Sequence, residues 1–276
     1  MMAQLTALRW RGETINFIAE GEGPPLVLLH GLGGNANNWL PQRTVLKREH
    51  LVLSLDFPGH GRSSGRDVGF AEYWAVIEAL LDHLEIDSAA LCGLSKGARA
   101  GLALTSRRPA RVERIIVVNA FVHLEPADKV SRLALYDLLG EPGGMIEWAQ
   151  QLLERMGVSD RPAIVRGFMN SLATIDPAHI RRIFTELVEY EQGPELAQIA
   201  CPVLIVRGEK DDFVPAYCAH DLNHRLQDSV MVRMTECGHL PYLENPVAFN
   251  EIAGAFLSGD PEGPSRPAGG CKPTFC

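Results

Sequence analysis

Short runs of apolar residues alternate along the chain with longer amphipathic stretches. This alternation is typical of a mostly parallel sheet covered by helices. The apolar runs predict eight strands: Gln4–Trp10, Thr14–Ala19, Pro25–His30, Leu51–Leu55, Ala89–Leu94, Arg114–Asn119, Val203–Arg207 and Val230–Thr235. The later runs are almost wholly apolar, as expected of strands buried on both faces. The first two runs are joined by Arg11-Gly12-Glu13, and they predict an antiparallel hairpin at one edge of the sheet.

Helical periodicity occupies several of the gaps between these strands. It predicts four helices: Phe70–Leu84, Lys96–Arg107, Ala216–Leu226 and Pro246–Leu257. From about Phe121 to Leu196 no convincing strand occurs, only amphipathic segments interrupted by glycine and proline. The sequence therefore predicts an α/β core over residues 1–120 and 197–258, with a helical cap inserted at 121–196.

Composition narrows the classes of function. The 276 residues are 46% hydrophobic and 22% charged, as in an ordinary globular protein. The formal net charge of −8 argues against binding to nucleic acid, which needs clustered lysine and arginine. The sequence contains no run of eighteen consecutive apolar residues, so no membrane span is predicted. Its N-terminus lacks the basic-then-apolar pattern of a secretory signal. We therefore expect a cytoplasmic location, with a disordered Pro- and Gly-rich tail at 259–276.

Six cysteines are scattered along the chain without CxxC or zinc-type spacing. They are Cys92, Cys201, Cys218, Cys237, Cys271 and Cys276. The first four are interpreted as small apolar core residues. A disulfide that involves the last two is left open.

Gly93-Leu94-Ser95-Lys96-Gly97 follows an apolar strand and opens a predicted helix. In that setting G-x-S-x-G indicates a nucleophilic serine on a tight strand-to-helix turn, with the helix N-terminus beneath the developing oxyanion. Alternatively, Ser95 caps the helix and the glycines serve the turn alone. The downstream residues favour the catalytic interpretation.

A serine nucleophile needs a base and a group that orients the base. His239 lies in a loop bounded by Gly238 and Pro241 after the last predicted strand, and we expect it to be the base. The loop after Val203–Arg207 offers Glu209, Asp211 and Asp212. Asp211 is the predicted acid, Asp212 is the competing choice, and Glu209 is expected to face solvent.

Backbone N–H groups are expected to stabilise the oxyanion. Gly31-Leu32-Gly33-Gly34 follows an apolar strand, and a glycine-rich loop there exposes such donors. We assign them to Leu32 and Lys96. The loop lacks the G-x-G-x-x-G spacing of a dinucleotide site, so no cofactor is predicted.

Five ordered motifs together resemble those of the α/β-hydrolase superfamily. They are His30-Gly31-Leu32-Gly33-Gly34, Asp56 through Ser63, Gly93-Leu94-Ser95-Lys96-Gly97, Gly208 through Pro215, and Gly238-His239 through Pro246. The resemblance covers roughly residues 10–258. Within the superfamily, the sequence most resembles the branch of small bacterial esterases and enol-lactonases, which also includes aminoacrylate-type hydrolases. It implies a cap over the site, cofactor-free chemistry and a Ser–Asp–His triad at Ser95, Asp211 and His239. A serine nucleophile argues against haloalkane dehalogenase and epoxide hydrolase chemistry.

Lys96 departs from the family pattern, in which an uncharged residue often follows the nucleophile. Two interpretations are open: the cation favours an anionic substrate, or it points to solvent.

His220 and His224 have the spacing of a zinc pair, but no third ligand is evident, so an exposed helix face and no metal site are predicted. Asp56 and His60 to Arg62 are expected to organise a loop beside the site.

Several large side chains are candidates for lining an acyl or alcohol pocket, although packing in the core or cap explains them equally well. They are Trp39, Phe121, Trp148, Phe168 and Met169.

The predicted activity is hydrolysis of a small-molecule carboxylic ester or lactone through an acyl-enzyme. Alternatives on the same fold are an amide or C–C bond hydrolase and a slow-turnover ligand receptor with an intact triad. The cap is also a possible homodimer interface. Fold alone does not decide the substrate.

Overall fold

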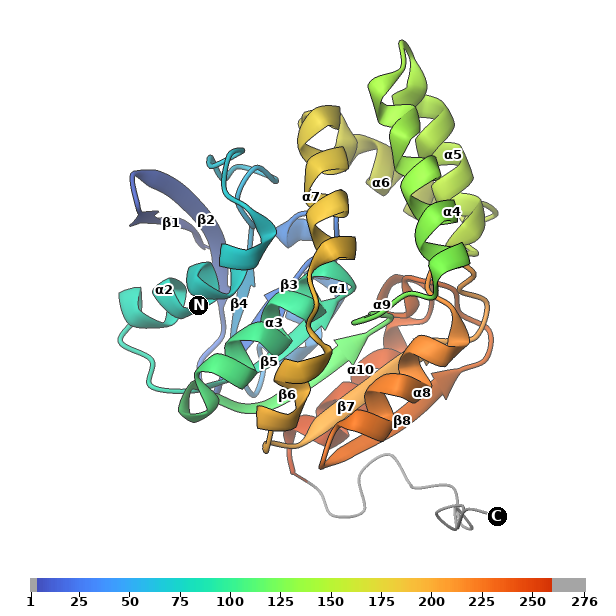
Figure 1. Cartoon of the computed structure of the whole chain (residues 1–276). Coiled ribbons are helices and arrows are strands. Elements are labelled where there is room, and N and C mark those ends of the chain that lie inside the picture. The colour runs from blue at the N-terminus through green and yellow to red at the C-terminus, as the bar shows by residue number, and fades with distance from the viewer. Residues whose placement is uncertain (1–3, 260–276) are drawn as a thin grey trace, which may run out of the picture.

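Eight strands form one mixed sheet in the computed structural model, which describes residues 4–259 (Figure 1). The strands are β1 Gln4–Trp10, β2 Glu13–Glu20, β3 Pro25–Leu29, β4 Leu51–Leu55, β5 Ala89–Leu94, β6 Val112–Val118, β7 Val203–Gly208 and β8 Ser229–Met234. Their spatial order is β1-β2-β4-β3-β5-β6-β7-β8. Every neighbouring pair from β4 to β8 is parallel. The predicted mostly parallel, eight-stranded sheet is therefore confirmed.

The antiparallel edge is the hairpin of β1 and β2. Arg11 and Gly12 both have positive φ, 48° and 89°, as a two-residue turn that matches the twist of the strands requires. β2 then pairs antiparallel with β4 and joins the hairpin to the parallel part of the sheet. The predicted hairpin is confirmed.

Helices cover both faces of the sheet. Outside the insert they are α1 Leu40–Leu46, α2 Tyr73–His83, α3 Lys96–Arg107, α8 Ala216–Arg225, α9 Pro241–Glu244 and α10 Pro246–Leu257. Helix α1 packs with α10, and α2 packs with α3; Figure 1 shows α2, α3 and α8 in front of the sheet. The central strand β5 is buried at all of its positions, which explains its unbroken apolar sequence.

A helical insert lies between β6 and β7, above the carboxyl ends of the strands (Figure 1). Its helices are α4 Pro126–Asp137, α5 Gly144–Arg155, α6 Pro162–Leu172 and α7 Pro177–Glu189. A proline stands in the first turn of α4, α6 and α7, where its missing N–H is not needed by the helix. The predicted helical insertion is confirmed.

Shorter elements were harder to predict. Short 3-10 helices occur at Ala36–Trp39, Phe70–Glu72, Pro109–Arg111, Leu138–Gly140 and Gly193–Gln198. The helix predicted from Phe70 therefore begins with a 3-10 turn, and α1 was not predicted because seven residues are too few to show periodicity.

Within residues 4–259, no helix combines the length and apolar composition needed to cross a membrane. The tail predicted at 259–276 lies outside the described residues except for Gly259.

Candidate active site

Ser95 occupies a strained turn between β5 and α3. Its backbone has φ 48° and ψ −111°, a combination that few L-residues adopt and that the surrounding structure must impose. The Ser95 N–H donates to the carbonyl of Val118 at 2.9 Å, and the Ser95 carbonyl accepts from Arg99 N at 3.1 Å. The neighbouring strand and the helix thus hold the turn from both sides.

Two glycines make this turn sterically possible. A Cβ on Gly97 would collide with the carbonyl oxygen of Leu29 on β3, and a Cβ on Gly93 would collide with the backbone of Ala98. Helix and sheet therefore approach more closely than any side chain allows. The spacing of G-x-S-x-G follows directly from this contact.

Asp211 and His239 form a buried hydrogen-bonded pair. His239 Nδ1 lies 2.7 Å from Asp211 Oδ2, and the two residues are 4% and 1% exposed. The other carboxylate oxygen, Oδ1, accepts hydrogen bonds from the N–H groups of Phe213 at 2.9 Å and Val214 at 3.0 Å. Both oxygens are engaged, so the carboxylate is fixed in orientation and leaves His239 Nε2 as the free ring nitrogen.

The competing acids are placed differently. Asp212 is exposed, and its hydrogen bonds are made by its backbone. Its N–H donates to the carbonyl of Arg155, and its carbonyl accepts from the guanidinium of Arg132. Glu209 pairs with Arg233 at 3.2 Å. Of these three carboxylates, only Asp211 contacts His239.

Leu32 and Lys96 present backbone N–H groups near Ser95. Lys96 is the first residue of α3, where an N–H has no partner within the helix, and Leu32 lines the same cavity as Ser95. Within the described part of the chain, neither N–H donates a hydrogen bond. Both N–H groups are therefore without an internal partner among the described residues, and their role as oxyanion donors stays a prediction.

A model of the alpha/beta hydrolase family matches residues 26–252. The chain belongs to this family. It is 28% identical to 3-oxoadipate enol-lactonase 2 of Acinetobacter baylyi, over 88% of this chain and 92% of that one. It is 29% identical to 2-hydroxy-6-oxo-2,4-heptadienoate hydrolase of Pseudomonas putida, over 87% and 91%. An enol-lactonase structure from Burkholderia xenovorans superposes with a TM-score of 0.82 at 24% identity, over 92% of this chain and all of that one.

Asn119 is a residue of this hydrolase that sequence analysis missed. It follows β6 with φ 40°, and its side-chain amide donates to the carbonyls of Gly238 and His239, both at 3.0 Å. Its carbonyl oxygen accepts from Gly208 N at 3.0 Å. One buried side chain therefore ties the ends of β6 and β7 to the histidine loop. The available signal was a polar residue directly after an apolar strand.

Glu244 supports the same loop from the other side. Its carboxylate accepts from Gly238 N at 2.9 Å and from Leu240 N at 3.1 Å. Burial raises the pKa of Glu244, and these backbone donors lower it in part. His239 is thus held through both of its sequence neighbours.

The Lys96 side chain faces neither solvent nor the cavity that Ser95 lines, so both interpretations of it were wrong. It is fully buried, and its amine lies 3.4 Å from His60 Nε2 and over the rings of Phe57 and Tyr73, at 4.5 and 5.0 Å. Burial lowers the pKa of Lys96 well below its usual range, and the Asp56 carboxylate offsets this only in part. The side chain packs inside the core while the backbone N–H stays at the turn.

Replacing Lys96 with methionine is expected to remove a pH dependence of stability. In the unfolded chain the amine titrates at about 10.4, whereas burial lowers its folded-state pKa. Between those two values the unfolded chain binds the proton and the folded protein does not, so the free energy of unfolding rises with pH. Urea unfolding from about pH 7 to about pH 10 should show the wild type gaining stability relative to Lys96→Met. The partly exposed Lys129→Met serves as control, and equal slopes in wild type and Lys96→Met would contradict the burial.

The loop after β4 is organised by Asp56, as expected. Its carboxylate accepts from Ala36 N at 2.7 Å and Arg62 N at 3.0 Å, and its carbonyl accepts from the Ser63 hydroxyl at 2.7 Å. The pKa of Asp56 is raised by burial. His60 is buried beside Lys96 and does not line the cavity that contains Ser95.

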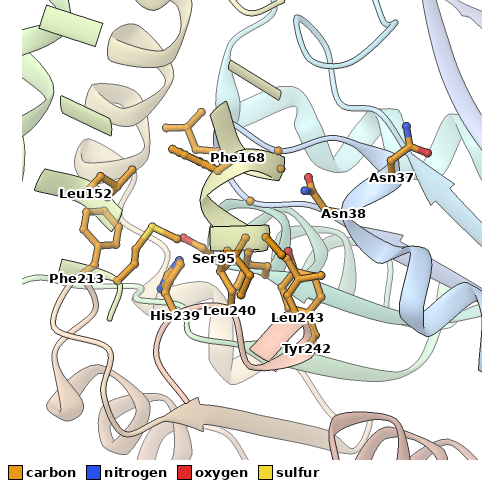
Figure 2. Close-up of a pocket in the computed structure, with 18 of the residues that line it drawn as sticks. Asn37, Asn38, Ser95, Leu152, Phe168, Phe213, His239, Leu240, Tyr242 and Leu243 are labelled. Atoms are coloured by element: carbon orange, nitrogen blue, oxygen red, sulfur yellow. The ribbon is translucent and has the colours of Figure 1, made fainter. Parts of the chain in front are cut away.

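A cavity of about 490 Å³ contains both Ser95 and His239 (Figure 2). Figure 2 shows Leu152 and Phe213 on the His239 side of Ser95, and Asn37 and Asn38 on the opposite side. Helices α5 and α6 of the insert supply part of its wall. The helical insert therefore covers the site, as the sequence predicted.

Among the proposed pocket residues, only Phe168 lines this cavity. Trp39 and Trp148 are fully buried; Trp39 stacks on Tyr242 with ring centroids 4.2 Å apart. Phe121 is buried against the guanidinium of Arg99. For most of the five, packing is thus the correct interpretation.

The His220–His224 pair and the cysteines differ in exposure. His220 and His224 lie on an exposed face of α8, and no three His, Cys, Asp or Glu residues between 4 and 259 are grouped as metal ligands. Cys92, Cys218 and Cys237 are buried free thiols, and Cys201 is half-buried. Cys271 and Cys276 lie outside the described residues.

Proposed function

We propose that this hydrolase cleaves a carboxylic ester or lactone of a small molecule through an acyl-enzyme on Ser95. The observation that carries the proposal is the Asp211–His239 hydrogen bond of 2.7 Å at a cavity that also contains Ser95 on its strained turn. Serine acylation needs a nucleophile, a base and a group that orients the base, and the presence of these three residue types around one cavity supports the proposal. The likeness to an enol-lactonase supports lactones as well as open-chain esters.

In the proposed mechanism, His239 Nε2 removes the Ser95 proton as Oγ attacks the substrate carbonyl carbon. The negative charge that develops on the carbonyl oxygen is stabilised by the N–H groups of Leu32 and Lys96. Asp211 accepts from Nδ1–H and stabilises the imidazolium. His239 then protonates the leaving alcohol, and a water that it deprotonates cleaves the acyl-enzyme.

A p-nitrophenyl alkylphosphonate tests this chemistry directly. Attack by Ser95 Oγ on phosphorus releases p-nitrophenolate and leaves a stable phosphonyl-serine, which mimics the tetrahedral intermediate. We expect release of about one nitrophenolate per chain and a matching mass increase on the peptide that contains Ser95. Labelling of another residue, or of none, would contradict the proposal.

Hydrolysis of a C–C bond is the second candidate, because the chain is 29% identical to a heptadienoate hydrolase. A receptor function would instead give a burst of about one product equivalent without sustained turnover. Steady-state kinetics on esters distinguishes a receptor from a hydrolase, since a hydrolase continues to turn over after the first equivalent, and comparison of kcat/KM for an ester with that for a C–C substrate distinguishes the two hydrolases.

A further inference from the structure

The wall of the substrate cavity carries no carboxylate and no side-chain cation. Of the residues between 4 and 259, no Lys, Arg, Asp or Glu lines it. Apart from the triad members, its polar side chains are hydroxyls and amides: Asn37, Asn38, Tyr136 and Tyr242. Burial raises the pKa of both tyrosines, so their hydroxyls stay protonated and neutral. In the proposed reaction, His239 carries the proton of Ser95 as the base.

The basic side chains close to this wall are engaged elsewhere. Lys96 follows Ser95, but its amine contacts His60 on the far side of the turn. Arg132 reaches the backbone of Phe213, which lines the cavity, and its guanidinium is occupied by the carbonyls of Asp212 and Phe213 and by the Asp128 carboxylate at 2.9 Å. Neither side chain is available to bind an anion in the cavity.

Carboxylates, by contrast, lie directly behind the wall. Asp211 contacts His239 and the N–H of Phe213, and Glu244 contacts the N–H of Leu240. Both carboxylates are hydrogen-bonded to residues that line the cavity. Their charge would repel an anionic group placed there, and the low dielectric of a site covered by the insert would strengthen that repulsion.

The rest of the wall favours apolar groups. Its aliphatic and aromatic side chains come from the core and from helices α5 and α6: Leu32, Leu152, Ile164, Phe168, Phe213 and Leu243. Burying an alkyl chain against such a surface is favourable, whereas burying an unpaired carboxylate is costly. The two effects act in the same direction on substrate choice.

We infer that the substrate of the proposed hydrolysis is an uncharged ester or lactone with apolar acyl and alcohol groups, and that carboxylate-bearing analogues are rejected. This inference rests on the proposed function. It assigns selectivity to the neutral wall, and it gives no role to the buried Lys96 amine.

Three p-nitrophenyl esters of matched length test the inference. They are p-nitrophenyl hexanoate, the mono-p-nitrophenyl ester of adipic acid, and methyl p-nitrophenyl adipate, which caps the same carboxylate. We expect kcat/KM for the monoester to be lower than for its methyl ester by roughly 100-fold or more. A ratio within about tenfold would overturn the inference, because it would mean that the wall tolerates a carboxylate.

A cation placed in the wall should weaken the preference for the methyl ester. Ile164 is half-buried on α6 and lines the cavity, so Ile164→Arg brings a guanidinium to the site, and Ile164→Gln is the uncharged control. We expect Ile164→Arg to raise kcat/KM for the monoester relative to the methyl ester by about tenfold or more, and Ile164→Gln to leave that ratio unchanged. An equal change in both variants would contradict the charge argument.

The two proposals fail in different ways. If the proposed function is wrong, Ser95→Ala retains full activity on every ester. If only the selectivity is wrong, Ser95→Ala is inactive but the wild type hydrolyses the monoester as fast as the methyl ester.

Discussion

The Ser95→Ala variant is expected to hydrolyse p-nitrophenyl butyrate with a kcat/KM lowered by about 10⁴-fold or more. Alanine removes the only atom that bonds to the substrate carbonyl in the proposed mechanism. The N–H groups of Leu32 and Lys96 and the apolar wall remain, so binding and some stabilisation of a water attack persist. The measurement is steady-state hydrolysis at high enzyme concentration, with active-site titration to exclude traces of wild type.

The matched control for this variant is Ser54→Ala. Ser54 is a fully buried serine on β4, and among the described residues its hydroxyl has no hydrogen-bond partner. We expect Ser54→Ala to keep activity within a few-fold of wild type and Ser95→Ala to keep its thermal stability. An active Ser95→Ala protein would refute the nucleophile, and a loss in both variants would indicate a general effect of cavity formation.

The main sheet, the tight turn at Ser95 and the Asp211–His239 pair could be predicted from the sequence, because all three depend on local patterns. A strand buried on both faces is apolar along its length, so β5 and β7 could be predicted without any tertiary information. The turn at Ser95 could be predicted because it requires glycines at fixed distances on either side. Asp211 and His239 follow strands that the hydrophobic pattern had already located.

Side-chain direction could not be predicted in the same way. Lys96 has its N–H at the turn and its amine in the core, and only the packing of Phe57, Tyr73 and His60 decides this. Asn119 joins three segments that are far apart in sequence, so its position after an apolar strand could mark it as a candidate but could not show which segments it contacts. In the insert, periodicity shows that a helix has an apolar face but not which residues of that face meet the substrate. Phe168 and Trp148 were therefore indistinguishable.

The Asp211→Asn variant is expected to lower kcat by about 10⁴-fold with the fold intact. The hydrogen bonds around Asp211 explain why such a conservative change has so large an effect. Oδ1 accepts from the N–H groups of Phe213 and Val214, and an asparagine must keep its carbonyl oxygen there, because its NH₂ group would oppose two donors. The NH₂ group is therefore forced toward His239.

An NH₂ donor facing Nδ1 reverses the tautomer of His239. Nδ1 must then accept, so the ring proton moves to Nε2, which can no longer take the proton of Ser95. Asp212→Asn is the matched control, since its exposed carboxylate touches no part of the site, and it should retain activity within about twofold. Kinetics of the two variants on one ester decides between the acids: a large loss in Asp212→Asn with a mild one in Asp211→Asn would transfer the role. Asp211, unlike Asp212, has both carboxylate oxygens hydrogen-bonded and contacts His239, so of these two replacements only Asp211→Asn should change which nitrogen of His239 carries the proton.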